Sequence, residues 1–329
     1  MKRKVFLSGL TSCFLYGLLV VFMYPAPAAY GQEKIRIGIS AATAAFLPTI
    51  VAEKKGFYTK YGLTSEHIHI SMAAVGMNAL GTGDLDYGVT LAQGVAAAMR
   101  GVPVKITMMT QDKLVFFLIV KPNIQKVADL KGKTVGISYL GGTIHVVGDV
   151  IFRKYGLVPG KDLNLLPSGD ERGRLAAMDQ GLTDALIGSP PLNIHGAKRG
   201  YKILLWARDH VNLPQNGLIV SEKKLQQSPD QVKRVIKGTI EALQFIKDRR
   251  EESIDILAKW TKADKETATA MFDGYAAAYS TDGTMTDEAL QAAIDDAASR
   301  AKPDKKITIS HIATRTILSE AQKELGLKK

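Results

Sequence analysis

The sequence predicts an α/β protein of two lobes, each a mostly parallel sheet flanked by helices, with C-terminal helices covering the first lobe. Two observations support this fold class. Apolar strands alternate with helical segments from residue 35 onward, which is typical of parallel sheets. Four short patterns also recur 94 to 99 residues apart. Because four weak matches keep one register, we interpret them as two units of the same design.

The repeated patterns locate the elements of each unit. They are "RIGIS" at 36 and "TVGIS" at 134, "KYGL" at 60 and 154, Ala-apolar-x-x-Gly-x-x-Asp at 79 and 177, and Arg-Gly at 100 and 199. The first helix of each unit is expected to end at a glycine suited to a left-handed conformation, Gly62 or Gly156. The expected strands are Ile35–Ser40, Leu85–Thr90, Val104–Thr110, Thr134–Ser138, Ala185–Ser189 and Tyr201–Trp206.

Beyond Trp206 the pattern predicts a strand over Leu218–Ser221 and a helix opened by a capping box at Ser228, with proline at its first position. Further helices are expected around 254–260, 266–279, 287–299 and 310–325. With crossings near 117–122 and 208–216, the first lobe comprises residues 32–117 and 217–329, and the second lobe comprises residues 118–216.

The first 31 residues have the pattern of a secretory signal peptide. A basic stretch precedes an apolar run from Val5 to Met23, and Ala29-Tyr30-Gly31 is the best cleavage site. An uncleaved membrane anchor and a lipoprotein attached through Cys13 are the alternatives. We therefore expect a periplasmic protein that has no membrane span after cleavage. A monomeric state is a separate expectation.

Composition excludes several function classes. Cys13 is the only cysteine, so cleavage removes every thiol and with it disulfides, thiolate metal sites and cysteine nucleophiles. The histidines lack metal-ligand spacing, and His67 and His69 are expected on the solvent face of a strand. The 43 basic residues outnumber the 32 acidic ones but are not interleaved with aromatics, which argues against nucleic acid. No metal or cofactor is expected.

Two α/β lobes that face one another place their strand ends in one cleft, where ligands bind beside helix N-termini. Loops after the strands therefore supply the candidate ligand-binding residues. In the first lobe these are Thr43, Phe46, Gly76, Asn78, Thr90, Gln93 and Gln111, and in the second lobe Gly142, Thr143, Asp170, Arg172 and Ser189.

Gly132-Lys133-Thr134 is not a phosphate-binding loop, because Val127 stands where that loop needs glycine and a strand follows. Gly142 and Thr143 instead begin a helix, where amides and a hydroxyl can bind a ligand; Thr143 could also cap that helix. Arg172 and Arg174 in a first helical turn favour an anionic ligand, although Asp170 offers them a charge partner.

No catalytic constellation is present. Ser189 and His145 could be imagined as a nucleophile and base, but the Gly-x-Ser-x-Gly motif is absent and His145 lies within an apolar helix. We therefore expect a binding protein and no enzyme.

Five segments carry a family resemblance: "FLPTIVAEKKGFYTKYGL", "ALGTGDLDYGVT", "RGVPVKI", "VADLKGKTVGIS" and "GLTDALIGSPP". They resemble the nitrate/sulfonate/taurine family of ABC-transporter substrate-binding proteins, which also contains binders of thiamine pyrimidine precursors. The resemblance implies the type II periplasmic-binding fold and delivery of a ligand to a membrane permease. It does not imply a particular ligand, because this family diverges widely in ligand. The loop "SAATAAF" carries no charge, so a sulfonate or nitrate site is not transferred to it; a small organic molecule, anionic or ring-bearing, is the expectation.

Two other functions remain open at the level of sequence. One is a ligand-sensing module that reports to a membrane receptor. The other is an enzyme of the same fold, because fungal pyrimidine synthases look similar across both lobes. Those enzymes depend on a cysteine-rich iron motif, which a chain without Cys13 does not contain.

Overall fold

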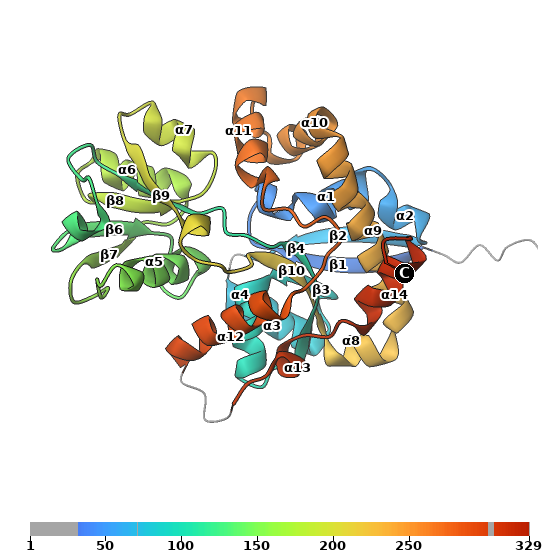
Figure 1. Ribbon diagram of the computed structural model, residues 1–329. Coiled ribbons are helices and arrows are strands. Elements are labelled where there is room, and N and C mark those ends of the chain that lie inside the picture. Colours follow the sequence, from blue (N-terminus) through green and yellow to red (C-terminus); the bar gives the residue numbers. More distant parts are fainter. Residues whose placement is uncertain (1–31, 71, 302–305, 329) are drawn as a thin grey trace, which may run out of the picture. The chain divides into compact units, whose positions relative to one another are not determined.

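The computed structural model describes residues 32–328 apart from 71 and 302–305 (Figure 1). The predicted signal peptide and Cys13 lie outside the described residues. The chain from Gln32 onward forms a single compact unit that contains two five-stranded sheets. None of the helices within the described ranges is long and apolar enough to cross a membrane.

The first sheet has the strand order β2-β1-β3-β10-β4. Strand β1 pairs in parallel with β2 and β3, whereas β10 runs antiparallel to β3 and β4. Four strands therefore share one direction and β10 alone is reversed. The strands are β1 (Glu33–Ile39), β2 (Leu63–His69), β3 (Tyr87–Thr90), β4 (Val104–Gln111) and β10 (Asn216–Ser221).

The second sheet repeats this plan in the order β7-β6-β8-β5-β9, with β5 as the reversed strand. The reversed strand of each sheet is the one the chain forms directly after arriving from the other sheet (Figure 1). The strands are β5 (Phe117–Val120), β6 (Thr134–Ile137), β7 (Asn164–Pro167), β8 (Ala185–Gly188) and β9 (Lys202–Trp206).

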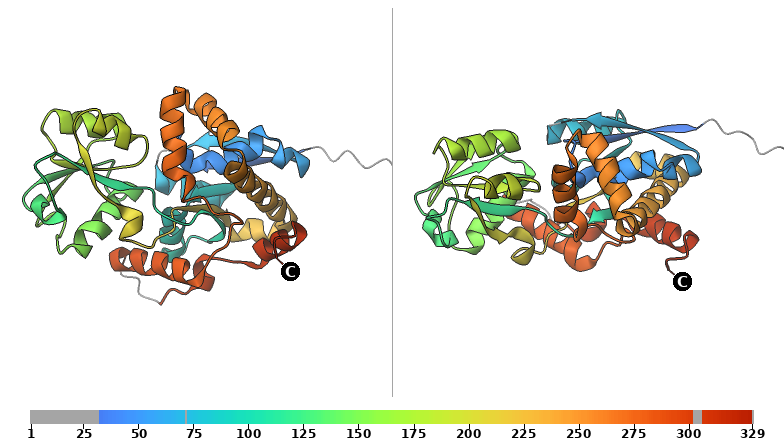
Figure 2. Two further views of the ribbon diagram at one scale, coloured as in Figure 1. Left: turned by 45° about the horizontal axis from the view of Figure 1, so that its top comes forward. Right: turned by 90° about the horizontal axis from the view of Figure 1, so that it is seen from above.

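Helices cover both sheets, and the C-terminal helices gather with the first sheet, as Figure 2 shows from two sides. Those associated with the first sheet are α1 (Leu47–Lys54), α2 (Phe57–Lys60), α3 (Ala73–Thr82), α4 (Leu91–Met99), α8 (Glu222–Gln227), α9 (Pro229–Asp248), α10 (Arg250–Thr261), α11 (Lys265–Ala276), α12 (Asp287–Ala301), α13 (Ile309–Ile312) and α14 (Thr316–Glu324). The second sheet carries α5 (Thr143–Lys154), α6 (Glu171–Asp179) and α7 (Leu192–Ala197), and single 3-10 turns occur at Ala44–Phe46, Val127–Leu130 and Ala207–Asp209.

Strand β5 shows how the second sheet is buried on both faces. Leu118 and Val120 pack with α5 in one apolar cluster, while Phe117 and Ile119 pack with Leu175 of α6 and others in a second cluster. Alternate side chains of a strand point to opposite faces, so an unbroken apolar run is what a doubly covered strand needs.

The repeated Gly-x-x-Asp pattern has one structural role in both sheets. Asp86 Oδ2 accepts a hydrogen bond from the backbone N–H of Arg36 at 2.8 Å, and Asp184 Oδ2 accepts one from Thr134 at 3.1 Å. Each aspartate thus connects the residue just before one strand, β3 or β8, to the first strand of the same unit, β1 or β6. The two bonds are offset by the same 98 residues, from 36 to 134 and from 86 to 184.

The predicted strands and helix ends are confirmed, with three corrections. The first crossing lies at 112–116, because Phe117 already begins β5. The helix expected over 310–325 is two helices, because Ala313 forms a bridge beside Ile106 of β4 and interrupts the helical turn. Ser228 makes no side-chain cap at the start of α9. The lobe boundaries at 117 and 217 remain a prediction.

His67 is not on a solvent face. Helix α1 covers this side of β2, so the His67 side chain is only 8% exposed and lies between two partners. Its Nδ1 is 2.9 Å from Glu53 Oε2, and its Nε2 is 3.0 Å from Thr49 Oγ1. The alternation correctly separates the two histidines from the isoleucines on opposite faces of β2. The face that carries His67 is covered by α1, and His67 is satisfied there by its hydrogen bonds to Glu53 and Thr49.

Candidate ligand-binding cavity

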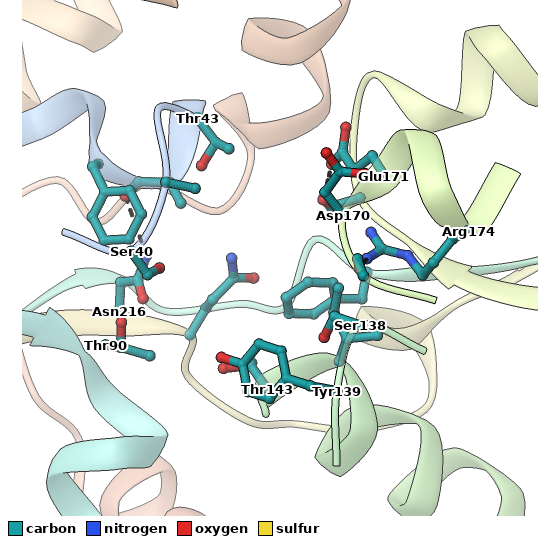
Figure 3. A pocket seen from close by; sticks show the side chains of 18 of the residues that line it. Ser40, Thr43, Thr90, Ser138, Tyr139, Thr143, Asp170, Glu171, Arg174 and Asn216 are labelled. Carbon is teal, nitrogen blue, oxygen red and sulfur yellow. Dashed lines mark hydrogen bonds between the residues drawn. The ribbon is translucent and has the colours of Figure 1, made fainter. Parts of the chain in front are cut away.

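A cavity of about 580 Å³ lies where the carboxyl ends of strands from both sheets meet (Figure 3). Ser40 follows β1, Thr90 ends β3, Ser138 follows β6, and Ser189 follows β8. These are the ends of same-direction strands, where an open sheet leaves room for a ligand beside the next helix. The geometry is therefore the one expected for a binding site between two α/β units.

Eight of the twelve candidate residues line this cavity. The first sheet and its loops contribute Thr43, Phe46, Thr90 and Gln93, and the second contributes Thr143, Asp170, Arg172 and Ser189. Thr90 and Ser189 occupy the same place in the repeat, each immediately at or after the end of a buried strand. The repeat is thus sufficient to bring equivalent loops to one place.

Four candidates do not line the cavity. The sequence predicts that this helix begins near Val75–Asn78. Helix α3 begins at Ala73 instead, so Gly76 and Asn78 lie inside it, and Asn78 is exposed. Gln111 is fully buried and its Oε1 accepts a hydrogen bond from Asn216 Nδ2 at 2.9 Å, so it supports the wall from behind. Gly142 is covered by the Tyr139 ring, which would lie 2.5 Å from a β-carbon at that position.

Thr143 begins α5, as expected, with Gly142 as the N-cap residue. The N-cap residue is a glycine and provides no side-chain cap, and the nearby Gly141 N–H donates to His145 Nδ1 at 2.9 Å, so Thr143 does not act as the cap. The Thr143 side chain therefore has no capping role that would compete with a contact to a molecule in the cavity.

Several lining residues escaped the sequence reasoning. Tyr275 comes from α11, far along the chain, Gln215 ends the second crossing, and Asn216 begins β10. Nothing in their local sequence distinguishes them from ordinary helix or strand residues. Phe116, in the first crossing, could have been considered because the crossing joins the two sheets between which the cavity lies.

The first-sheet side of the cavity is held by hydrogen bonds to the loop after β1. Tyr279 Oη donates to the Ala44 carbonyl at 2.6 Å, and Asn216 Nδ2 donates to the Ala45 carbonyl at 3.2 Å. Burial raises the pKa of Tyr275, and the negative charge of Glu171 raises it further. The Tyr275 hydroxyl is therefore a neutral donor at any physiological pH.

The second-sheet side is built on the start of α6. Asp170 is the N-cap residue, and its Oδ1 accepts a hydrogen bond from the Gly173 N–H at 2.9 Å. A β-carbon at Gly173 would collide with the carbonyl oxygen of Ser168, so only glycine lets this loop fold back against the helix. This tight loop places Glu171 and Arg174 at the cavity.

Arg174 is 2% exposed, which is rare for an arginine. Its Nη1 donates to the Gly169 carbonyl at 2.8 Å, while its Nε has no partner within the described chain. Figure 3 shows Arg174 with Asp170 and Glu171 on one side of the cavity, opposite Ser40, Thr43 and Thr90. Arg172, the other arginine of this turn, also lines the cavity but is exposed.

Glu171 was not a candidate, yet it is the carboxyl most affected by the cavity. Its Oε1 accepts a hydrogen bond from Ser189 Oγ at 3.0 Å. Burial raises the pKa of the Glu171 carboxyl to about 7, against the opposing charge of Arg174 and the Ser189 hydrogen bond. The Ser189 hydroxyl thus donates to a carboxyl and not to a histidine base.

The charged residues along the cavity are balanced. Asp170 and Glu171 carry two negative charges when ionised, and Arg172 and Arg174 carry two positive ones. The sequence-based expectation of an anionic ligand counted the two arginines and only one acid. Across the described residues, no group of three or more histidine, cysteine or acidic side chains is arranged to hold a metal ion.

The chain matches the family model described as NMT1/THI5 like over residues 43–253, and it belongs to this family. A candidate binding protein of Brucella abortus is 26% identical over 280 residues, covering 80% of this chain and 81% of the relative. The predicted resemblance to substrate-binding proteins is confirmed.

Solved structures show the same fold. The periplasmic aliphatic sulphonate binding protein SsuA of Escherichia coli has a TM-score of 0.74 at 19% identity, covering 86% of this chain and 92% of that protein. The periplasmic nitrate-binding protein NrtA of Synechocystis PCC 6803 has a TM-score of 0.72 at 17% identity, covering 89% of each chain. The fold is that of the two-lobed periplasmic binding proteins, and both of these structural relatives are periplasmic binding proteins.

Proposed function

We propose that this chain is the solute-binding component of an ABC importer, which captures a small organic molecule in the cavity and delivers it to a membrane permease. The observation that supports this most directly is the cavity between the strand ends of the two sheets. Its walls come from both halves of the chain, so a bound molecule would contact both, which is how a two-lobed protein couples binding to closure.

The size and lining of the cavity favour a ligand larger than a simple inorganic anion. A volume of about 580 Å³ lies within the roughly 300–1,000 Å³ typical of small-molecule sites. Four rings line it, from Phe46, Phe116, Tyr139 and Tyr275, together with hydroxyl and amide side chains. A molecule with a flat or apolar body and a few polar groups fits such a lining.

Export to the periplasm, cleavage of the first 31 residues and a monomeric state belong to the same proposal. The basic and apolar N-terminal pattern supports export, and the periplasmic location named for the two structural relatives agrees with it. Binding without catalysis is proposed because the Ser189 hydroxyl donates to the Glu171 carboxyl and not to a histidine, and because the sequence lacks the Gly-x-Ser-x-Gly nucleophile motif.

The test is native mass spectrometry of the protein purified from its own periplasm before dialysis, followed by a thermal-shift screen of sulfonates, dicarboxylates, aromatic acids, amides and pyrimidines. A bound molecule stabilises the folded state by mass action, so we expect a co-purified small molecule or a concentration-dependent rise in melting temperature. Thr143→Trp, which fills the cavity, should abolish that rise, whereas Thr64→Trp on the exposed face of β2 should not.

Retention of full binding by Thr143→Trp would place the ligand elsewhere and exclude this cavity. Absence of any bound molecule and of any shift in the whole screen would contradict the solute-binding function. Delivery to a permease is checked separately by affinity purification of the ligand-loaded protein from solubilised membranes. Capture of a receptor kinase or chemoreceptor in place of a permease would favour the sensor function.

A further inference from the structure

Two groups of opposite charge lie close together on the cavity wall without forming a hydrogen-bonded ion pair. Glu171 and Arg174 are three residues apart in the first turn of α6, a spacing that puts both side chains on one helix face. Within the described chain, however, Arg174 makes no ion pair, and its only hydrogen bond goes to the Gly169 carbonyl. Glu171 instead accepts a hydrogen bond from Ser189.

The unused Nε–H of Arg174 is the strongest sign of a missing partner. A buried donor that has lost water and gained no acceptor carries a free-energy penalty, and native structures contain few such groups. Arg174 is 2% exposed as a whole residue and lines the cavity, so an acceptor on a bound molecule can satisfy this donor. Arg174 therefore calls for an acceptor on the ligand.

Glu171 calls for the opposite group. Its carboxyl lines the cavity, and a Ser189 hydroxyl supplies only one of the hydrogen bonds that two carboxyl oxygens can accept. The groups that face it are Asp170 and Arg174 on its own helix and Tyr275 from α11. Of these, only Arg174 is positively charged, so a donor on the ligand would add what this carboxyl lacks.

Resting on the proposed solute-binding function, we propose that Glu171 and Arg174 recognise a neutral amide-type group, in which an acceptor for Arg174 stands beside an N–H donor for Glu171. A primary amide or a ring lactam has this pairing. When Glu171 is ionised, the charges of Asp170, Glu171, Arg172 and Arg174 balance, which disfavours a ligand with net charge. The rings of Phe116 and Tyr139 offer surfaces for the body that carries the group.

The test uses three probes with one ring and different charge: benzamide, benzoate and benzamidine. Saturation-transfer NMR measures their binding to the full mature protein at pH 7.5. We expect benzamide to bind at least about fivefold more tightly than either charged probe. Greater affinity for benzoate or benzamidine, or no binding of benzamide at millimolar concentration, would overturn the proposal.

Glu171→Leu removes the acceptor at nearly constant volume, and Glu66→Leu, on the exposed face of β2, is the matched control. Glu171→Leu should weaken benzamide about tenfold and strengthen benzoate, because Arg174 then acts without an opposing carboxyl; Glu66→Leu should change neither. An unchanged order of affinities in Glu171→Leu would show that Glu171 does not select the ligand.

Glu171→Gln provides a second measurement if the leucine variant does not fold. It removes the charge but keeps both a donor and an acceptor. Benzamide should bind within about twofold of the wild-type value, while benzoate should bind several-fold more tightly. Loss of benzamide binding would contradict the proposal. A co-purified molecule or another hit in the broad screen, together with failure of benzamide, would leave the solute-binding function intact and remove only this inference.

Discussion

The α-carbon of Gly274 in α11 faces the ring of Pro190, which follows Ser189 at the end of β8. A β-carbon at Gly274 would lie 2.6 Å from Pro190 Cβ and closer still to Cγ. This contact joins a helix that packs on the first sheet to a loop of the second sheet, directly beside a cavity-lining serine. The close approach of the two halves on this side therefore requires that position 274 carries no side chain.

We expect Gly274→Ala to destabilise the protein even though alanine is the better helix former. The added methyl group must push Pro190 and the adjacent Ser189 away, at a cost of about 1–3 kcal/mol. Gly81→Ala in α3 is the matched control, since its β-carbon would meet only Val102 at 3.8 Å. That variant should gain about 0.5–1 kcal/mol in urea unfolding. A stabilised Gly274→Ala would show that the two halves are not in tight contact there.

The two repeat aspartates should differ in their contribution to stability. Asp86 accepts hydrogen bonds from Arg36 and from Lys224 Nζ at 2.9 Å, with its side chain 10% exposed. Asp184 has one such backbone bond and a distant Lys121. We expect Asp86→Asn to cost about 2–4 kcal/mol because two cations lose their partner, and Asp184→Asn about 1 kcal/mol. Equal losses in denaturant unfolding would contradict this assignment.

Glu171 should make stability depend on pH in the direction opposite to most carboxyls. Burial raises the pKa of this carboxyl to about 7, above its unfolded value of 4.5. Its favourable contribution is complete below pH 4.5 and is lost as the pH rises through 7. By linkage, the loss is about 3 kcal/mol at pH 8 and above.

Glu171→Gln should therefore gain stability relative to the wild type between pH 5 and pH 8, as measured by urea midpoints in matched buffers. Glu320→Gln, at an exposed position on α14, serves as the control for replacing a carboxylate by an amide. A wild-type to Glu171→Gln difference that stays constant with pH would show that Glu171 is solvated in the folded protein.

Glu53 should give the opposite dependence. The hydrogen bond from His67 is the main cause that lowers the pKa of the Glu53 carboxyl to about 2, although burial works against it. Its contribution is present above pH 4.5 and is lost as the pH falls toward 2. Because the Glu53 side chain is partly exposed, solvent reduces the effect, and Glu53→Gln should cost about 1–2 kcal/mol at pH 7. The difference should vanish near pH 2 in acid unfolding; its persistence there would exclude the ionic contribution.

The local elements of the fold could be predicted because their causes are local. Gly62 and Gly156 both adopt positive φ, at 70° and 77°, where the chain must turn after a helix. The burial of β5 on both faces appears as an uninterrupted apolar run. One helix was predicted over 310–325, but the structure has two. The interruption at Ala313 could not be predicted locally, because it depends on a bridge to Ile106, about 200 positions earlier in the chain.

The sequence by itself determined the two-unit plan, the strand ends and eight of the residues that line the cavity, because a repeat in register places equivalent loops at equivalent strand ends. Only the tertiary structure decided that Tyr275 lines the cavity, that Gln111 supports it from behind, and that Arg174 is buried there beside a partly buried Glu171. The burial of a side chain and its loss of water depend on every segment that packs around it, including segments far away in the sequence. A residue's charge state and its unmet hydrogen bonds therefore emerge only when the distant parts of the chain come together.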